Sequence, residues 1–210
     1  MTGSTQDLDD GTLHEATART YVALADLLAG DARLWDAPTL CAGWQVRHVV
    51  AHVTMPARLT PEQFGAEMAA GGGDFGRLSD TVAARDAALP TADLLAALRS
   101  PTLHGWQPPG GGAIGAVSHA VIHSLDVSVA LGTDPVAPPD AVAAVRDHLV
   151  AADGAVFGVD LDGVRLEDPG TGWSHGSGAG VGADSGRLVA LLAGRQLPDG
   201  RALRRRSPIG

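Results

Sequence analysis

The stretch AIGAVSHAVIHSLDVSVAL, residues 113–131, decides the fold of this 210-residue chain. Its apolar side chains recur on nearly every side of a helical wheel, and Gly132 follows as a typical helix end. A helix that is apolar almost all round belongs in the interior of a protein. The sequence therefore predicts a buried central helix inside a helical bundle, coated by Ile114, Val117, Val121, Ile122, Leu125, Val129 and Leu131.

One narrow polar stripe interrupts this apolar surface. His119 and His123 are four residues apart, which places them about 40° apart around the helix axis, and Asp126 continues the stripe within about 60°. Buried imidazoles need polar partners, and one metal ion would satisfy both rings at once. Ordinary hydrogen-bonded core histidines are the alternative. We predict a divalent-metal site in which His119 and His123 are two of the ligands.

A third ligand has to come from another element. Residues 44–55 predict a second helix, in which His52 lies at the edge of the apolar face, about 120° from its centre. His48 lies on the outer side of the same helix, at about 160°, beside Arg47. We therefore predict His52 as the third ligand, and a four-histidine site that includes His48 stays an open alternative. Solvated or structural roles are expected for His14, His104, His148 and His175.

The rest of the chain surrounds this centre. Periodic patterns predict helices over 12–29, 76–89, 91–99, 139–152 and 183–193, with short strands at 159–166 and near Trp173. Pro56 and Pro61 break the pattern after the second helix, and residues 101–112 are typical of a long loop. We predict a disordered N-terminus over 1–10, a metal-binding helical bundle over 11–155, a small α+β extension over 156–200 and a solvated basic tail over 201–210.

Composition excludes several classes of protein. The net charge of −9 argues against a nucleic-acid partner, which would need a basic face. The polar, acidic N-terminus is unlike a signal peptide, and we find no run of about 18 apolar residues, so no membrane partner is expected. Cys41 is the single cysteine, which excludes an internal disulfide and a cysteine cage for zinc. We expect a cytoplasmic protein, either a monomer or a homodimer.

Three segments resemble a known family. Residues 43–52, GWQVRHVVAH, resemble the W-x-V-R-D-L-V-x-H signature of the DinB-like metalloproteins, in particular the actinobacterial mycothiol-dependent maleylpyruvate isomerase family. Residues 119–126, HAVIHSLD, resemble its E-x-x-x-H-x-x-D motif, and residues 188–195, LVALLAGR, resemble an L-x-x-L-x-G-R element near the end of family members. The resemblance covers nearly the whole chain.

The resemblance implies a mainly α fold, a DinB-like four-helix bundle with a small C-terminal α+β extension. It also implies a divalent ion held by three residues, with zinc as the first candidate and nickel or another ion as alternatives. His52 and His123 fall on the family's ligand positions, whereas His119 stands where the isomerases carry Glu. His48 replaces the Asp of the signature, which agrees with its interpretation as a non-ligand. A three-histidine set is similar to that of other DinB-like thiol transferases.

The predicted chemistry follows from this ligand set. An ion with three neutral ligands keeps its positive charge, so an open position could bind water or a thiol. The resemblance implies the thiol: mycothiol or a relative, activated to attack an electrophilic small molecule, which makes the protein a thiol-dependent transferase or isomerase. A hydrolase using bound hydroxide, and a non-catalytic metal-binding protein, are the alternatives. No Glu lies beside the histidine pair as a general base, although Asp126 could serve.

Four further residues are candidates for supporting roles. Asp126 could orient a metal ligand or hydrogen-bond to the backbone. Arg195, with Arg85 behind it, is the candidate for binding the thiol or the substrate, against an ordinary surface role for either. Cys41 precedes the helix of His52, where a helix N-terminus would lower the pKa of its thiol, but we expect it to be a packed cysteine.

Overall fold

The structure is a computed structural model, and it describes residues 8–206. Within that range it contains ten α-helices, two short 3-10 helices and three strands. The helices are α1 (Asp10–Ala29), α2 (Val46–Val53), α3 (Met55–Arg58), α4 (Pro61–Ala70), α5 (Phe75–Asp86), α6 (Thr91–Leu98), α7 (Pro101–His104), α8 (Gly112–Leu131), α9 (Pro139–Ala151) and α10 (Ser185–Leu192), with η1 (Ala32–Asp36) and η2 (Ala155–Phe157). The strands are β1 (Val164–Asp168), β2 (Trp173–Gly176) and β3 (Ala179–Gly182).

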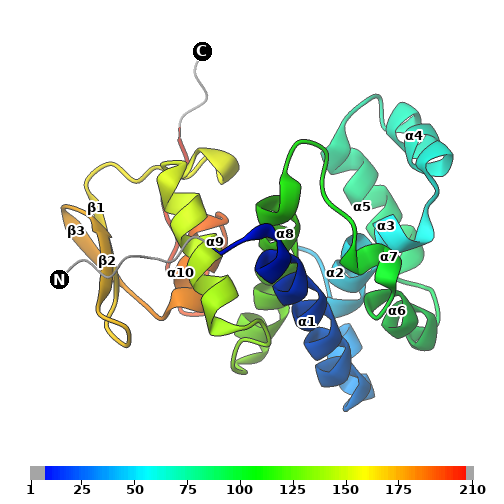
Figure 1. Ribbon diagram of the computed structural model, residues 1–210, viewed down its shortest axis with the longest axis horizontal. Helices are drawn as coiled ribbons and strands as arrows, with labels where there is room; N and C mark the ends of the chain where they lie inside the picture. The colour runs from blue at the N-terminus through cyan, green and yellow to red at the C-terminus, as the bar shows by residue number, and fades with distance from the viewer. Residues whose placement is uncertain (1–7, 207–210) are drawn as a thin grey trace.

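The central helix is α8, as predicted. Figure 1 shows it between the sheet at one end of the molecule and α3 to α7 at the other. Helix α1 packs against α8, α8 packs against α2, and α2 packs against α5, so these four form the bundle. The predicted mainly α fold, a four-helix bundle with a small C-terminal α+β extension, is confirmed.

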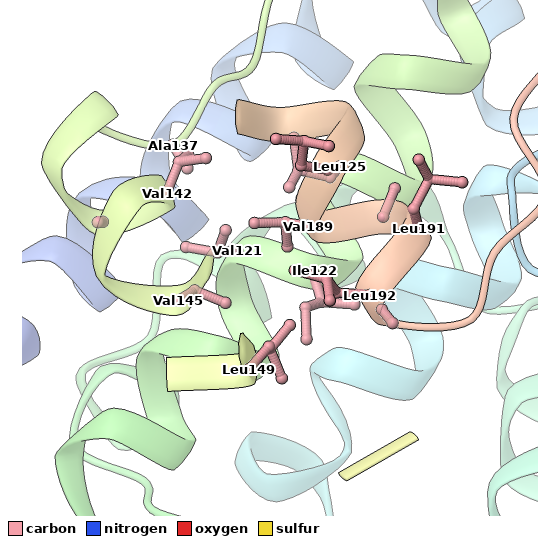
Figure 2. Packing of buried hydrophobic residues seen from close by; sticks show 14 of the residues in the cluster. Val121, Ile122, Leu125, Ala137, Val142, Val145, Leu149, Val189, Leu191 and Leu192 are labelled. Atoms are coloured by element: carbon pink, nitrogen blue, oxygen red, sulfur yellow. The ribbon is translucent and has the colours of Figure 1, made fainter. Parts of the chain in front are cut away.

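Two hydrophobic clusters bury α8 from both sides. The first joins α8 to α9 and α10, and Figure 2 shows the side chains of these three helices meeting. The second joins Ala120 and Val127 of α8 to α1, α2 and α6. Apolar neighbours cover most of the circumference, so that in the polar stripe Asp126 is fully buried and His119 and His123 are half-buried.

Helix α8 is also long and apolar enough to cross a membrane by length and composition, with a mean hydropathy of 1.5 over its best 18 residues. The sequence analysis found no such run. The helix is nevertheless the core helix of this bundle, and 61% of that window is buried inside the protein. Core helices often reach these values, since their burial by protein requires the same apolar surface as burial by lipid.

The extension packs on the bundle through α10. Its strands have the order β2-β1-β3, with β1 antiparallel to β2 and parallel to β3. Helix α10 contacts α8, α9 and β1, so the extension and the bundle share one hydrophobic cluster. The boundary near residue 155 falls at the start of η2, shortly after α9 ends, and stays a prediction. Of the basic tail, Arg205 and Arg206 donate hydrogen bonds to carbonyl oxygens of Phe157, Gly194 and Val159, which ties residues 205 and 206 to the extension.

Three helices escaped the sequence analysis. Helix α3 contains Pro56, which we took as a break, within its first turn. Helix α4 begins at Pro61 with Thr60 as its N-cap, so the proline that we took as a break is the first residue of a helix. Helix α4 buries none of its residues, which explains why it gives no apolar periodicity. The short α7 lies inside the predicted loop 101–112. Of the predicted disordered N-terminus, residues 1–7 lie outside the described residues, while Asp9 caps α1 and Asp10 is already helical.

Candidate metal centre

The structure brings His52, His119 and His123 together from two helices. His52 comes from α2, and the other two come from successive turns of α8. The three ring centroids lie 4.8 to 5.3 Å apart, and one nitrogen from each ring lies within 4.8 Å of the other two. Among the described residues this cluster and a second group, Cys41, His123 and Asp126, are the sets of side chains that could hold a metal ion.

The spacing of two ring nitrogens suits a shared ion. Nε2 of His119 lies 3.3 Å from Nε2 of His52. Two nitrogens bound at about 2.05 Å around a tetrahedral ion would be separated by roughly 3.3 Å. The same distance is long for a direct hydrogen bond between two imidazoles. The pair therefore fits two ligands of one ion better than it fits a direct contact.

Each ring of α8 has a partner on its other nitrogen. Nδ1 of His119 lies 2.9 Å from the hydroxyl of Tyr21, and Nδ1 of His123 lies 2.9 Å from Oδ2 of Asp126. Asp126 is a carboxylate, so His123 donates its Nδ1 proton and keeps the Nε2 lone pair free. Partners of this kind commonly fix the orientation of metal-binding histidines.

The ring nitrogens of His52 have fewer hydrogen-bond partners than those of the two histidines of α8. It is buried, with 6% of its surface exposed, and its Nδ1 has no hydrogen-bond partner among residues 8–206. A buried polar atom without a partner is unusual in a folded protein. The described side chains therefore leave the polar atoms of His52 poorly satisfied, and an ion on Nε2 would supply a partner for one of them.

Aromatic side chains enclose the histidines. The ring of His52 lies 5.4 Å from Trp44 and 6.4 Å from Phe75, and the ring of His119 lies 5.3 Å from Trp106. Aromatic residues make up only 4% of the chain, so this grouping is not a matter of abundance. The sequence analysis gave Trp44 only as part of a family signature, and it missed Phe75, Trp106 and Tyr21, because nothing in their local sequence places them beside the histidines. Phe75 is 51% exposed, which places an apolar ring at the outer edge of the site.

Asp126 is the hub of the polar contacts. Arg195 donates two hydrogen bonds to it, from Nε to Oδ1 at 2.7 Å and from Nη2 to Oδ2 at 3.0 Å. Cys41 donates a third from Sγ to Oδ2 at 3.0 Å, and His123 donates the fourth. Although burial alone would raise the pKa of Asp126, the hydrogen bonds from His123 and Arg195 hold it below its usual range. Asp126 therefore stays charged, with three of these hydrogen bonds on Oδ2 and one on Oδ1.

The structure corrects one expectation about Cys41. Burial raises the pKa of its thiol, and the charge of Asp126 raises it further. The helix N-terminus that we expected to lower this pKa is outweighed by these two effects. The thiol is thus protonated at neutral pH and acts as a hydrogen-bond donor, which agrees with the prediction of a packed cysteine.

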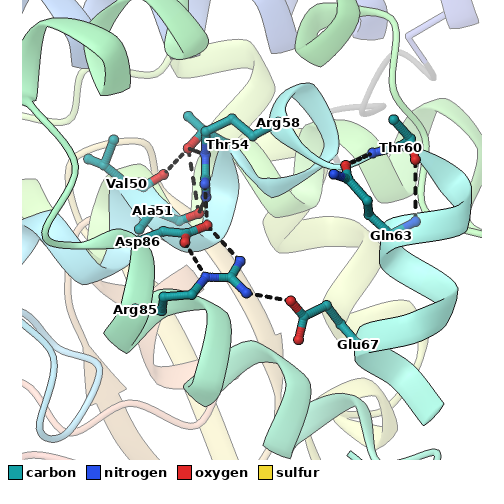
Figure 3. A network of polar contacts seen from close by, with 9 residues as sticks. All are labelled: Val50, Ala51, Thr54, Arg58, Thr60, Gln63, Glu67, Arg85 and Asp86. Atoms are coloured by element: carbon teal, nitrogen blue, oxygen red, sulfur yellow. Dashed lines mark hydrogen bonds and ion pairs between the residues drawn. The ribbon is translucent and has the colours of Figure 1, made fainter. Parts of the chain in front are cut away.

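The two arginine candidates have different surroundings. Arg195 lies in the centre but uses its Nε and Nη2 on Asp126, so its described role is to balance the charge of that carboxylate. Arg85 forms ion pairs with Glu67 and Asp86, and Asp86 also pairs with Arg58 (Figure 3). These pairs join α3, α4 and α5, and none of the described contacts of Arg85 reaches the histidines. The structure therefore gives Arg85 no place in the site.

His48 caps its own helix. Its Nδ1 accepts a hydrogen bond from the backbone N–H of Gln45 at 3.2 Å. The residue is one turn before His52 and does not belong to either group that could hold an ion. The four-histidine alternative therefore finds no support in the geometry.

A cavity at the junction of the bundle and the extension lies away from the histidines. It has a volume of about 960 Å³ and is lined by the C-terminal end of α8, the N-terminal ends of α9 and α10, and the sheet. Buried Arg146 and Asp168 line it, and both are already bonded to Ser185. The candidate metal centre is thus defined by its side chains and not by the size of a cavity.

The buried histidines predict a pH dependence of stability. Burial lowers the pKa of His52 to about 3 and also lowers that of His119. Each ring is neutral in the folded chain at pH values where it takes up a proton in the unfolded chain, near pH 6.5. The free energy of unfolding of the metal-free protein should therefore fall from pH 6.5 towards pH 3, by up to about 1.4 kcal/mol per pH unit for each ring.

Urea unfolding of chelator-treated protein between pH 7 and pH 4 measures this slope. The variant His52→Gln removes one of the two titrating rings and should give a shallower slope. Parallel curves for the two proteins would show that His52 is not held neutral by burial.

Comparisons with known proteins place this site in a family context. Residues 13–103, a little under half of the chain, match the family described as the mycothiol maleylpyruvate isomerase N-terminal domain. This segment contains Tyr21, Cys41 and His52, whereas His119, His123, Asp126 and Arg195 lie beyond it. No curated protein matches the chain.

Two solved structures share the fold. One is the crystal structure of the mycothiol-dependent maleylpyruvate isomerase, with a TM-score of 0.53 and 17% identity over 98% of this chain and 99% of that one. The other is a histidine-to-alanine mutant of the mycothiol-dependent maleylpyruvate isomerase, with a TM-score of 0.52, 16% identity and the same coverage. The resemblance inferred from the sequence is confirmed: residues 13–103 match the mycothiol maleylpyruvate isomerase N-terminal domain, and the chain as a whole is similar in fold to the solved isomerase.

Proposed function

We propose that this protein is a metal- and thiol-dependent transferase or isomerase, acting on a small electrophile. His52, His119 and His123 would hold a divalent ion, zinc as the first candidate, and mycothiol or a related thiol would be the cosubstrate. Such an ion supplies a positive charge that lowers the pKa of a bound thiol and makes it a nucleophile at neutral pH. The family of residues 13–103 and the fold support the thiol, and the histidine cluster supports the ion.

The charges of the centre favour an anionic ligand. Burial keeps His52 and His119 neutral, and the charges of Asp126 and Arg195 balance each other. The side chains therefore do not compensate the charge of a divalent ion. An anionic sulfur ligand would compensate it, as would an electrophile that carries a carboxylate.

The surroundings of Asp126 favour thiol chemistry over hydrolysis, because they leave the centre without an effective general base. A hydrolase needs a base to accept the proton of its water nucleophile. Asp126 is the carboxylate of the centre, but the hydrogen bonds from His123 and Arg195 hold its pKa below the usual range, which makes it a weak base. Tyr21 is no base either, because burial raises its pKa and keeps the hydroxyl protonated. A thiol cosubstrate is acidic enough to react without such a base once its pKa is lowered.

The test combines metal analysis with a thiol-dependent assay. Protein purified without chelator should contain about one equivalent of divalent metal, and it should accelerate conjugation or isomerisation of small electrophiles when mycothiol is present. Turnover should disappear after chelation and return with zinc. Turnover with water alone would favour the hydrolase, and metal-loaded protein that shows no turnover across carboxylate-bearing and neutral electrophiles would favour a non-catalytic protein. The expected cytoplasmic location belongs to this proposal, because a reduced thiol requires a reducing compartment.

A further inference from the structure

The loop before α2 contacts Asp126 twice. The backbone N–H of Leu40 donates to the carbonyl oxygen of Asp126 at 3.0 Å, and the thiol of Cys41 donates to its Oδ2 at 3.0 Å. The loop itself is closed on both sides of Cys41. Trp44 N–H donates to the Cys41 carbonyl at 2.9 Å, and Cys41 N–H donates to the hydroxyl of Thr39 at 3.2 Å. These hydrogen bonds within the loop fix the backbone of Cys41, independently of the contact that its side chain makes with α8.

The direction of the thiol hydrogen bond follows from its partner. An ionised carboxylate can only accept, so the sulfur of Cys41 must carry the proton. The oxygen that accepts it, Oδ2, is the same atom that accepts the Nδ1 proton of His123. Any shift of Oδ2 would therefore move the ring of His123 as well.

The same loop leads directly into the helix of His52. Helix α2 begins at Val46, and the ring of Trp44 faces His52 at 5.4 Å. Asp126 and His123 belong to α8, some 80 residues further along the chain. The Cys41 thiol thus links the element that carries His52 to the carboxylate that orients His123.

We propose that Cys41 is a positioning residue of the metal centre, whose thiol fixes Asp126 and thereby sets the ring of His123 relative to His52. This inference rests on the proposed function, since it assumes that the three histidines hold the ion. Cys41 is not itself a ligand in this arrangement, although Cys41, His123 and Asp126 also lie close enough to form a metal group. Arg195 already occupies both oxygens of Asp126, which disfavours that second group.

The test compares Cys41→Ala with Cys41→Ser. Serine keeps a donor of similar size, and alanine removes it. Zinc affinity, measured by competition with a chromophoric chelator, should fall about 10–100-fold in Cys41→Ala, the usual cost of losing a partner behind a metal ligand. Cys41→Ser should stay within a few-fold of the wild type. Equal affinity for wild type and Cys41→Ala, or equal losses in both variants, would overturn the proposal.

Two further measurements separate this inference from the proposed function. In metal-free protein, the Leu40 amide and His123 Nδ1 protons should exchange with solvent faster in Cys41→Ala and at the wild-type rate in Cys41→Ser. Unchanged exchange in Cys41→Ala overturns the inference whether or not metal binds, whereas wild-type protein that binds no zinc overturns the proposed function. In cobalt-substituted wild type, a sulfur-to-cobalt charge-transfer band without added thiol would show that Cys41 is a ligand and not a positioning residue.

Discussion

Replacing His52 with alanine is expected to remove the metal from the protein, while replacing His48 leaves it bound. The two histidines are one turn apart on α2, but only His52 lies within 4.8 Å of the nitrogens of His119 and His123. Loss of one of three protein ligands should lower zinc affinity by more than the 10–100-fold that outer partners cost, so by roughly 1000-fold or more. Thiol-dependent turnover should be lost with the metal.

His48→Ala is the matched control. It removes an imidazole from the same helix and costs the hydrogen bond to the Gln45 N–H, an effect of about 1 kcal/mol on stability. Metal content after dialysis, competition titration and circular dichroism of both variants give the comparison. Stoichiometric zinc in folded His52→Ala would show that another set of side chains holds the ion.

Replacing Asp126 with asparagine should give the largest loss of stability of any single change in the centre. Asp126 is fully buried and pairs with Arg195, which is itself 20% exposed. Asparagine would leave the arginine charge without its counter-charge and turn a donor group towards the thiol, imidazole or guanidinium. Breaking a buried pair in this way costs about 3–5 kcal/mol.

The control for this change is Asp26→Asn, which breaks the exposed ion pair between Asp26 and Arg99. Exposed pairs contribute about 0–1 kcal/mol, so Asp26→Asn should unfold close to the wild type in urea. A loss below about 1 kcal/mol in Asp126→Asn would contradict the role of Asp126 as the hub.

The effect of Asp126→Asn should also depend on pH. The pKa of Asp126 is lowered in the folded state, so its contribution is present above the unfolded value near pH 4 and is lost as the pH falls below it. Unfolding free energies of wild type and variant, measured without metal, should therefore converge in acid. A gap that stays constant from pH 7 to pH 3 would show that the charge of Asp126 does not carry the effect.

The polar stripe of α8 follows from the sequence alone. Positions four residues apart on a helix face the same way, so His119 and His123 had to point together once residues 112–131 were helical. The apolar circumference of this helix likewise determined that it would be buried, and therefore that the fold would be a bundle around it. The break assigned at Pro61 was wrong because α4 buries no side chain, and periodicity detects burial and not helicity.

Only the tertiary structure decided which side chains complete the centre. Tyr21 reaches His119 across 98 residues, Cys41 reaches Asp126 across 85, and Arg195 reaches Asp126 across 69. No local spacing encodes such contacts, because they depend on how α1, the loop before α2 and the segment after α10 pack on α8. The sequence by itself determined a buried helix with two histidines and an aspartate on one face. The packing of distant segments determined that the aspartate is a charged anchor with a lowered pKa and not a free base, because Arg195 and Cys41 reach it from those segments.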